Sequence, residues 1–215
     1  MFLIILKNGL NKYNKLLWIL FDKNKGEINM TTYTSIANVI KERRSVRTFT
    51  DKAVEKDLLI ELLNDATWAP NHKHREPWNC KLYIGEGRKK LVDAVLNSFT
   101  EEERAKRGKI LSDRFLSTPA QIVVYINEDP RQIQRDEDYA ATCAFMQNFQ
   151  LLAWERGLGC VWKSGGLNYN PLFIEGIGLT RGQRIVGILH IGYFDKAPEG
   201  KARTPITEKM EIIEG

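Results

Sequence analysis

The segment between residues 136 and 156 constrains the fold more than any other part of this sequence. Its pattern predicts one long helix with apolar side chains in nearly every direction around the axis. These side chains are Tyr139, Ala140, Cys143, Ala144, Phe145, Met146, Phe149, Leu151, Leu152 and Trp154. A helix that is apolar on all sides must be buried on all sides. A small domain encloses such a helix with difficulty, so we expect a second subunit to cover part of it.

Three apolar patterns predict strands. Nearly continuous apolar runs at 122–126 and 184–193 are typical of central strands that are covered on both faces of a sheet. At 78–84, apolar and polar residues alternate, as in a strand with one face buried.

Helices are predicted where apolar residues recur at helical spacing, near 36–40, 58–66 and 91–99. Thr34 or Ser35 can cap the first of them. The second is expected to stop before a proline, because the residue that precedes proline resists the helical conformation.

The predicted order is two helices, a strand, a helical region, a strand, the long helix, a strand, a short helix and a strand. A charged stretch at 101–109 is expected to be mobile. The chain has 215 residues and no internal repeat, which fits one ordinary domain. This order predicts an α+β or mixed α/β fold rather than a regular series of βαβ units.

The net charge of +5 is concentrated near the N-terminus. Residues 1–29 hold five lysines and two acidic residues, so the rest of the chain carries an excess of only two positive charges. The apolar runs 2–6 and 16–21 are shorter than the roughly 20 residues that a membrane span needs, and we expect no span. Residues 1–29 are expected to be an extension outside a domain that begins at Met30, and an interfacial helix is the alternative.

The three cysteines, Cys80, Cys143 and Cys160, have neither an even count nor CxxC spacing. They therefore argue against a disulfide scaffold or a zinc ribbon and favour a reducing compartment, so we expect a cytoplasmic protein. Basic residues occur at separate turns, many of them beside acidic residues. Nucleic-acid binding needs a continuous basic face with aromatic residues, and we expect no such partner.

A basic turn, Arg43-Arg44-Ser45-Val46-Arg47, follows the first predicted helix. Three guanidinium groups beside a hydroxyl can bind a phosphate and place a further cation on another part of the same ligand. A solvated basic turn is the alternative interpretation.

A polar loop at 69–78 contains a proline near each end, Pro70 and Pro77, and runs directly into the predicted strand. Its H-x-H pair, His72 and His74, suggests a metal, but His190 lies in a strand expected to be buried and no carboxylate cluster completes a ligand set. We therefore expect no metal site. The loop either offers donors to a planar polar ligand or is a purely structural surface loop.

A glycine-rich segment at 157–166 joins the end of the long helix to a short strand and a turn. Glycines let backbone amides approach a ligand closely. The segment is not a Rossmann motif, because its first glycines precede the strand instead of following it. Cys160 is expected to be a packed residue, with a catalytic thiolate beside Lys163 as the alternative.

The sequence has no Walker A motif, no G-x-S-x-G elbow and no H-E-x-x-H helix. No acid–base pair stands out either, and we assign no catalytic residue. Donor-rich, partly basic turns of this kind suit an anionic cofactor that brings its own chemistry.

At these three segments the chain resembles the FMN-dependent nitroreductase family, and in particular its compact bacterial branch. The shared patterns are R-R-S-x-R after the first helix, A-P-x-x-x-x-x-x-P-W before the first strand, and G-x-G-x-x-W-[KR]-S-G. They occur in the family's order and at its spacing, and the resemblance covers residues 34–206.

The resemblance implies an α+β, nitroreductase-like fold with a mixed, mostly antiparallel sheet covered by helices. It implies a homodimer with the long central helix at the interface and two FMN molecules bound between the subunits. The FMN-binding domain would be 30–215, with 1–29 outside it.

The same resemblance assigns cofactor contacts. Arg43, Arg44 and Ser45 would contact the FMN phosphate and ribityl chain. Arg47 would lie toward the pyrimidine end of the flavin, and His72 would hold the flavin of the partner subunit.

Further contacts implied by the resemblance come from the C-terminal half. Trp162, Lys163 and Ser164 would lie along the isoalloxazine ring. Arg203, in the pattern K-x-R with Lys201, would complete the phosphate site.

A protein of this family would take hydride from NADH or NADPH on flavin N5 and pass it to a small electron-poor acceptor such as a nitroaromatic or a quinone, with ping-pong kinetics. The alternatives are another flavin oxidoreductase on the same scaffold, such as a dehalogenase or a dehydrogenase, and a flavin-binding protein without turnover.

Overall fold

A four-stranded sheet forms the centre of the structure, a computed structural model that describes residues 3–6, 16–22, 27–33 and 35–215. Its order is β4-β5-β7-β6, and every neighbouring pair is antiparallel. The strands are β4 (Asn79–Ile84), β5 (Ala120–Asn127), β6 (Gly159–Lys163) and β7 (Gln183–Gly192). β5 and β7 are central and almost wholly buried, as their continuous apolar runs predict.

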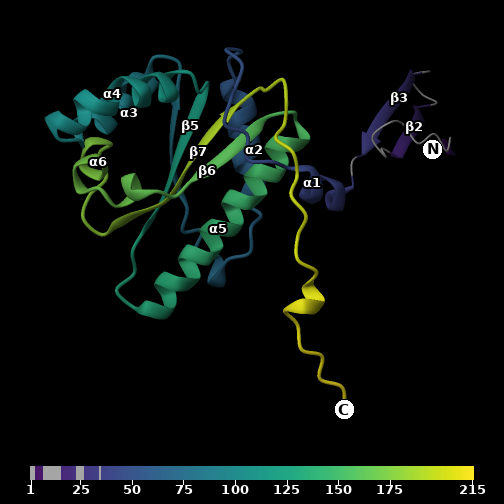
Figure 1. The fold of residues 1–215 in the computed structure, drawn as a ribbon. Helices are drawn as coiled ribbons and strands as arrows, with labels where there is room; N and C mark the ends of the chain where they lie inside the picture. Colours follow the sequence, from purple (N-terminus) through teal and green to yellow (C-terminus); the bar gives the residue numbers. More distant parts are fainter. Residues whose placement is uncertain (1–2, 7–15, 23–26, 34) are drawn as a thin grey trace.

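Helices cover both faces of this sheet (Figure 1). The described helices are α1 (Ile36–Glu42), α2 (Lys56–Ala66), α3 (Gly87–Asn97), α4 (Glu101–Leu116), α5 (Gln132–Glu155) and α6 (Pro171–Gly176). Ile122 and Val124 pack in the core with α2 and α5, whereas Val123 between them packs with α3, α4 and α6. This alternation follows from the two-residue period of a strand.

From α1 to β7 the predicted order of elements is confirmed, and the chain has the expected α+β fold. The three strands that precede α1 were not predicted. Ser35 caps α1 by accepting a hydrogen bond from the amide of Asn38. The sheet itself is antiparallel, and the parallel contribution within the described part of the chain is a single bridge between Ser45 and Cys160.

The long helix α5 begins four residues earlier than predicted, at Gln132. Phe145, Met146 and Phe149 are buried against the sheet, but Leu151, on another side of the helix, is only half-buried. The chain alone therefore leaves part of this apolar helix open. Its cover by a second subunit stays a prediction.

The stretch 101–109 was expected to be mobile, and that prediction is wrong, because it forms the first half of α4. Thr100 and Glu103 make a reciprocal capping box at the start of the helix. Ion pairs at i,i+4 spacing, such as Glu102–Lys106 and Glu103–Arg107, follow it. The charges that suggested mobility are spaced to support an exposed helix.

The described parts of the N-terminal region form a separate antiparallel sheet, β1-β2-β3. Its strands are β1 (Leu3–Leu6), β2 (Leu16–Asp22) and β3 (Glu27–Tyr33). These strands disfavour an interfacial helix there, although the residues between them lie outside the described part. The boundary at residue 30 stays a prediction. In the described residues, we find no helix with the length and apolar character that crossing a bilayer requires.

Gly159 allows the basic turn to approach the sheet. The amide of Val46 donates to the carbonyl of Cys160 at 3.2 Å, beside the bridge from Ser45 to Cys160. A Cβ on Gly159 would lie 2.7 Å from the Cβ of Val46 and 2.8 Å from the ring of Phe194. No ordinary packing contact is that short, so a side chain at this position must push the turn away.

Gly159→Ala is therefore expected to destabilise the protein by about 1–3 kcal/mol, because the added methyl overpacks a filled site. The midpoint of urea unfolding measures the loss. Gly87→Ala is the matched control, since a Cβ there meets nothing within 4 Å and should change stability by less than about 0.5 kcal/mol. Equal stability of Gly159→Ala and the wild type would contradict the close approach.

Candidate functional site

The bridge between Ser45 and Cys160 brings two of the three predicted segments together. It places the basic turn that follows α1 along β6, so residues far apart in the sequence form one edge of the domain. Cys160 itself is 2% exposed, and burial raises the pKa of its thiol. A buried, protonated thiol suits the packed residue that we expected and not a nucleophile.

At one end of this edge, Arg43 holds a buried donor without an acceptor. Its Nη1 has no hydrogen-bond partner within the described part of the chain. The neighbouring Arg44 is engaged differently, because its Nη1 donates to the carbonyls of Lys41 at 2.6 Å and Arg43 at 2.9 Å. A buried guanidinium N–H without a partner is costly unless a ligand satisfies it.

At the other end, a cavity of about 310 Å³ opens beside β6. It is lined by Arg47, Phe49, Arg114, Thr118, Val161, Lys163 and His190, and we call it the cation pocket. Arg47 comes from the basic turn, Arg114 from the last turn of α4, and Lys163 from the end of β6.

The three cations of the pocket form no ion pair with a carboxylate among residues that the structure describes. Burial, reinforced by the positive charges of Arg47 and Arg114, lowers the pKa of Lys163. Like charges that are gathered and partly desolvated favour binding of a negative or electron-rich group. The pocket can therefore hold such a group without any resident acid or base.

His190 closes the pocket from β7. It is 3% exposed, and its Nδ1 lies 3.2 Å from the hydroxyl of Thr118. Burial, together with the charges of Lys163 and Arg114, lowers the pKa of His190 to about 3. The imidazole is therefore neutral at physiological pH.

Arg114 and His190 are the functional candidates that the sequence did not reveal. Arg114 lies in α4, and because no helix was predicted there, its side chain could not be placed at the pocket from the sequence. His190 was judged only as a metal ligand, and its place beside Lys163 depends on the pairing of β6 with β7.

The loop that carries His72 is strained and firmly anchored. Lys73, His74 and Glu76 have φ values of 54°, 50° and 44°, in the left-handed region that side chains disfavour. Arg75 holds the loop to α5 through two hydrogen bonds to the carboxylate of Asp138, at 2.9 and 2.8 Å. Such strain persists only where the surroundings enforce it, and it is common at ligand clamps.

His72 is exposed on this loop, with its Nδ1 3.9 Å from Glu137 of α5. No residue of the loop lines the cation pocket of the same chain. The structure thus does not bring His72 to the other predicted contacts, and its role toward a partner's flavin stays a prediction. A metal-binding group of three His, Cys, Asp or Glu side chains is absent from the described residues.

The remaining predicted contacts lie in three places. Trp162 points to the opposite face of the sheet from Lys163, where its indole packs over Gly187. Ser164 is exposed just after β6. Arg203 is exposed in the C-terminal segment and donates to the carbonyl of Lys201 at 2.8 Å. Three residues earlier in that segment, Gly200 lies against the guanidinium of Arg44 in the basic turn.

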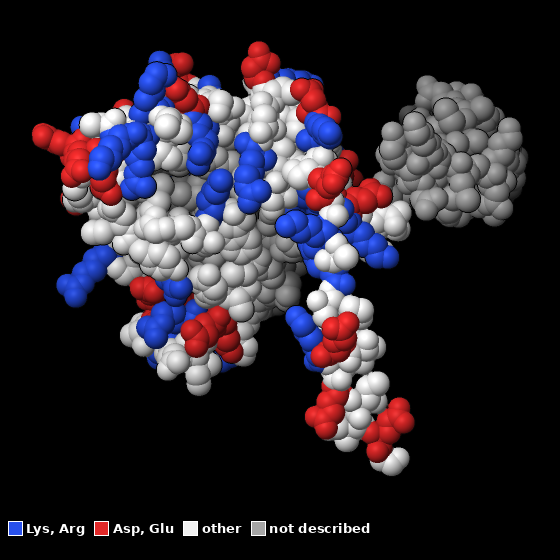
Figure 2. Space-filling view, viewed as in Figure 1, with Lys and Arg blue, Asp and Glu red and all other residues white. Residues whose placement is uncertain are grey.

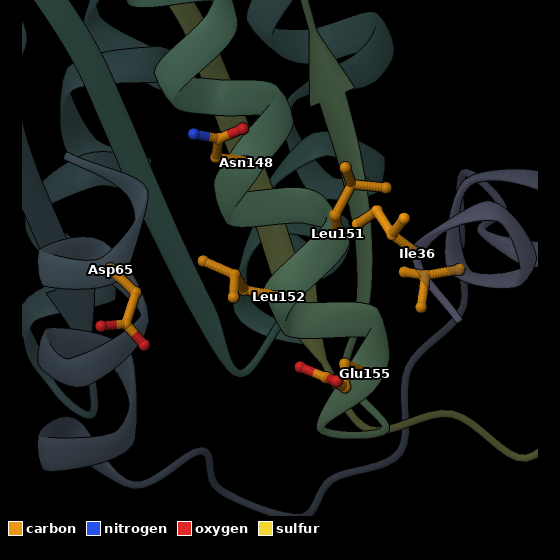
Figure 3. Close-up of a pocket in the computed structure, with 7 residues that line it drawn as sticks. Ile36, Asp65, Asn148, Leu151, Leu152 and Glu155 are labelled. Carbon is orange, nitrogen blue, oxygen red and sulfur yellow. The ribbon is translucent and has the colours of Figure 1, made fainter. Parts of the chain in front are cut away.

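A second cavity, of about 300 Å³, lies along the open side of α5 (Figure 3). It is lined by Ile36, Val39, Asp65, Asn148, Leu151, Leu152 and Glu155. Leu151 projects from α5 toward Ile36 of α1, while Leu152 projects toward α2. Ile36 is 65% exposed and Ile40 54% exposed, so this groove belongs to an uncovered apolar surface.

Comparison with known proteins agrees with this fold. The model of the Nitroreductase family matches residues 40–193, and a model of a protein of unknown function, DUF2606, matches residues 1–57. A crystal structure of a nitroreductase-like family protein from Bacillus cereus is 99% identical, covers 87% of this chain and 100% of its own, and superposes with a TM-score of 0.85.

Two further proteins are more distant. “Putative NAD(P)H nitroreductase YfhC” of Bacillus subtilis (strain 168) is 34% identical over 182 residues, which are 83% of this chain and 94% of that protein. The FMN and NADPH-dependent nitroreductase NfnB of a Sphigopyxis strain is 20% identical with a TM-score of 0.69, over 84% of this chain and 100% of that one. At that identity the likeness shows the fold alone.

His190→Gln is expected to flatten the acid dependence of stability. The folded protein keeps the pKa of His190 at about 3, whereas an unfolded chain has the ordinary value of 6.5. As the pH falls, the unfolded state binds the proton first. The part of the unfolding free energy that comes from this pKa difference is therefore complete above pH 6.5 and is lost progressively toward pH 3. Between neutral pH and pH 5 the wild type should lose about 2 kcal/mol of unfolding free energy through His190, and the variant should not show this loss.

Urea unfolding of both proteins at about pH 7.5 and about pH 5 measures this difference. The same pH dependence in both proteins would contradict a buried, neutral His190.

Proposed function

Because the chain belongs to the nitroreductase family, we propose that it is an FMN-dependent oxidoreductase that transfers hydride from NADH or NADPH to a small electron-poor acceptor. One observation carries the proposal. Among the residues that the structure describes, three cations without carboxylate partners line one pocket, at the same sheet edge as the buried and unpaired donor of Arg43. This donor set suits a cofactor with a phosphate at one end and an electron-rich ring at the other.

The residues of the chain fit FMN at its phosphate end. The buried Nη1 of Arg43 has no acceptor in the described part of the chain, and a phosphate oxygen would satisfy it. Ser45 and Arg44 lie in the same turn, although Arg44 also donates to backbone carbonyls. Arg203 would complete the phosphate site from the C-terminal segment, in which Gly200 lies against the guanidinium of Arg44.

The cation pocket fits the pyrimidine end of the ring. Bound FMN would supply the redox chemistry for hydride transfer from the nicotinamide to an acceptor such as a nitroaromatic or a quinone. Arg47, Arg114 and Lys163 would attract negative charge that gathers near N1 and O2 during reduction. A fixed positive charge at that place raises the reduction potential of the ring, and no proton donor of the chain is required for the role.

The chain works as a homodimer, because its apolar groove and the half-buried side of α5 need a cover. Figure 2 shows charged side chains of both signs around the margins of this face and a broad uncharged area where α5 runs. Burial of such a surface against a second copy is favourable at roughly 25 cal/mol per Å². His72 would then reach the flavin of the partner subunit.

Absorbance spectroscopy tests the proposed function directly. The purified protein should be yellow or take up added FMN, and its flavin band should bleach under anaerobic NADH or NADPH and return with a nitroaromatic or a quinone. Donor and acceptor share one site, so we expect ping-pong kinetics. A coloured protein that neither nucleotide bleaches would instead be a flavin-binding protein without turnover, and a colourless one that binds no FMN would refute the proposal.

Arg43→Ala and Arg47→Ala should separate the two ends of the site. Loss of a charge-assisted phosphate contact costs about 1.5–3 kcal/mol, so Arg43→Ala should weaken FMN binding about ten- to hundredfold. Arg47→Ala should lower the flavin reduction potential and keep the phosphate contact. Arg181→Ala, an exposed arginine just before the start of β7, is the control and should change neither quantity.

Fluorescence titration gives the affinity, and equilibration with reference dyes gives the potential. Wild-type affinity in Arg43→Ala would refute the phosphate contact. An unchanged potential in Arg47→Ala would refute its place beside the ring.

A further inference from the structure

The hydroxyl of Thr118 determines which nitrogen of His190 carries hydrogen. Its Oγ1 lies 3.0 Å from the carbonyl of Arg114, which also accepts from the hydroxyl of Ser117 at 3.1 Å. We assign the single hydroxyl hydrogen of Thr118 to that carbonyl, because two oxygens this close repel each other unless a hydrogen lies between them. Toward His190, at 3.2 Å, the same oxygen can only accept. Nδ1 of His190 must therefore carry a hydrogen.

Nε2 of His190 is then a bare acceptor on a residue that lines the cation pocket. The ring is neutral, and a neutral imidazole with hydrogen on Nδ1 has a lone pair on Nε2. This atom is buried and has no hydrogen-bond partner in the part of the chain that the structure describes. Lys163 and Arg114 are close enough to lower its pKa but do not bond to it.

Because the pocket holds a buried acceptor beside its cations, a matching ligand needs a hydrogen-bond donor as well as negative or electron-rich atoms. A simple oxyanion would suit Arg47, Arg114 and Lys163 but would face the lone pair of His190 with lone pairs of its own. A ring edge that alternates carbonyl oxygens with an N–H satisfies both kinds of group. The pyrimidine edge of a flavin has this pattern, with N3–H between the oxygens at C2 and C4.

We propose that His190 is a flavin-binding residue whose Nε2 accepts a hydrogen bond from flavin N3–H in the cation pocket. The inference rests on the proposed function, because it takes the ligand to be FMN. In a pocket that otherwise holds cations, His190 adds a neutral group that recognises an N–H donor. Thr118 is the positioning residue, since its hydroxyl holds the imidazole in the required tautomer.

The test compares FMN with N3-methyl-FMN, which lacks the N–H. Dissociation constants for both flavins are measured on the full-length wild type, His190→Leu and His190→Gln after bound flavin has been removed. The wild type should bind FMN about five- to tenfold more tightly than the N3-methyl form. In His190→Leu this ratio should fall toward one, and in His190→Gln, which keeps an acceptor oxygen, part of it should return.

The outcomes separate this inference from the proposed function. Tight FMN binding with the same ratio in the wild type and His190→Leu overturns the role of His190 and leaves the FMN enzyme standing. A wild type that binds neither flavin overturns both.

A second measurement needs no variant, in case a substitution at this buried site prevents folding. The ¹⁵N resonances of His190 in the wild type should show hydrogen on Nδ1 and none on Nε2, and the Nε2 resonance should move to its hydrogen-bonded position when FMN is added. An Nε2 resonance that carries hydrogen, or that does not respond to FMN, would overturn the proposal.

Discussion

Electrostatic repulsion among the cations of one sheet edge is the constraint on which the other features of this protein depend. Arg47, Arg114 and Lys163 line one cavity. Arg43, in the same basic turn as Arg47, has a buried donor that no group among the described residues accepts. The fold supplies no carboxylate to these groups within the described residues, although it pairs exposed cations elsewhere. Such an arrangement lowers the stability of the protein alone and favours the state in which an anionic ligand is bound.

Backbone contacts hold this repulsive group together. The hydrogen bond from Val46 to Cys160 ties the basic turn to β6, and antiparallel pairing with β7 places Lys163 beside His190. Gly159 keeps the space that the turn requires. The positions of the cations are thus determined by neutral groups, and they persist whether or not a ligand neutralises the charge.

The strained loop at 69–78 follows a different principle. Its left-handed residues are stabilised by an ion pair, because Arg75 binds both oxygens of a nearly buried Asp138 and also contacts Asp129. The geometry of His72 is therefore coupled to α5, the helix whose open side forms the apolar groove. A second subunit that covers α5 would meet a loop that is already fixed in shape.

Local pattern predicted most of the fold. The apolar runs in β5 and β7 and the all-round apolar helix α5 identified the centre of the fold, because an element that is buried on all sides has a nearly continuous apolar sequence. The helix α4 was missed since its charges, which form i,i+4 pairs, resemble a solvated linker in composition. Helical spacing within that stretch was a signal that could have found it.

The candidate site was predicted only where one segment carries it. The basic turn and the end of β6 were identified from their residues, but Arg114 and His190 join them through tertiary packing that no local pattern records. The side of the sheet on which Trp162 lies could have been predicted from the sequence. Successive strand residues point to opposite sides, so Trp162 must point away from the side that Val161 and Lys163 share. Its side chain lies with the core on the α5 face.

A crystal structure of the protein with FMN bound tests the central claim most directly. We expect electron density for the pyrimidine end of the ring in the cavity formed by Arg47, Arg114, Lys163 and His190, with the phosphate on Arg43. A flavin bound elsewhere, with these cations still facing an empty cavity, would contradict it.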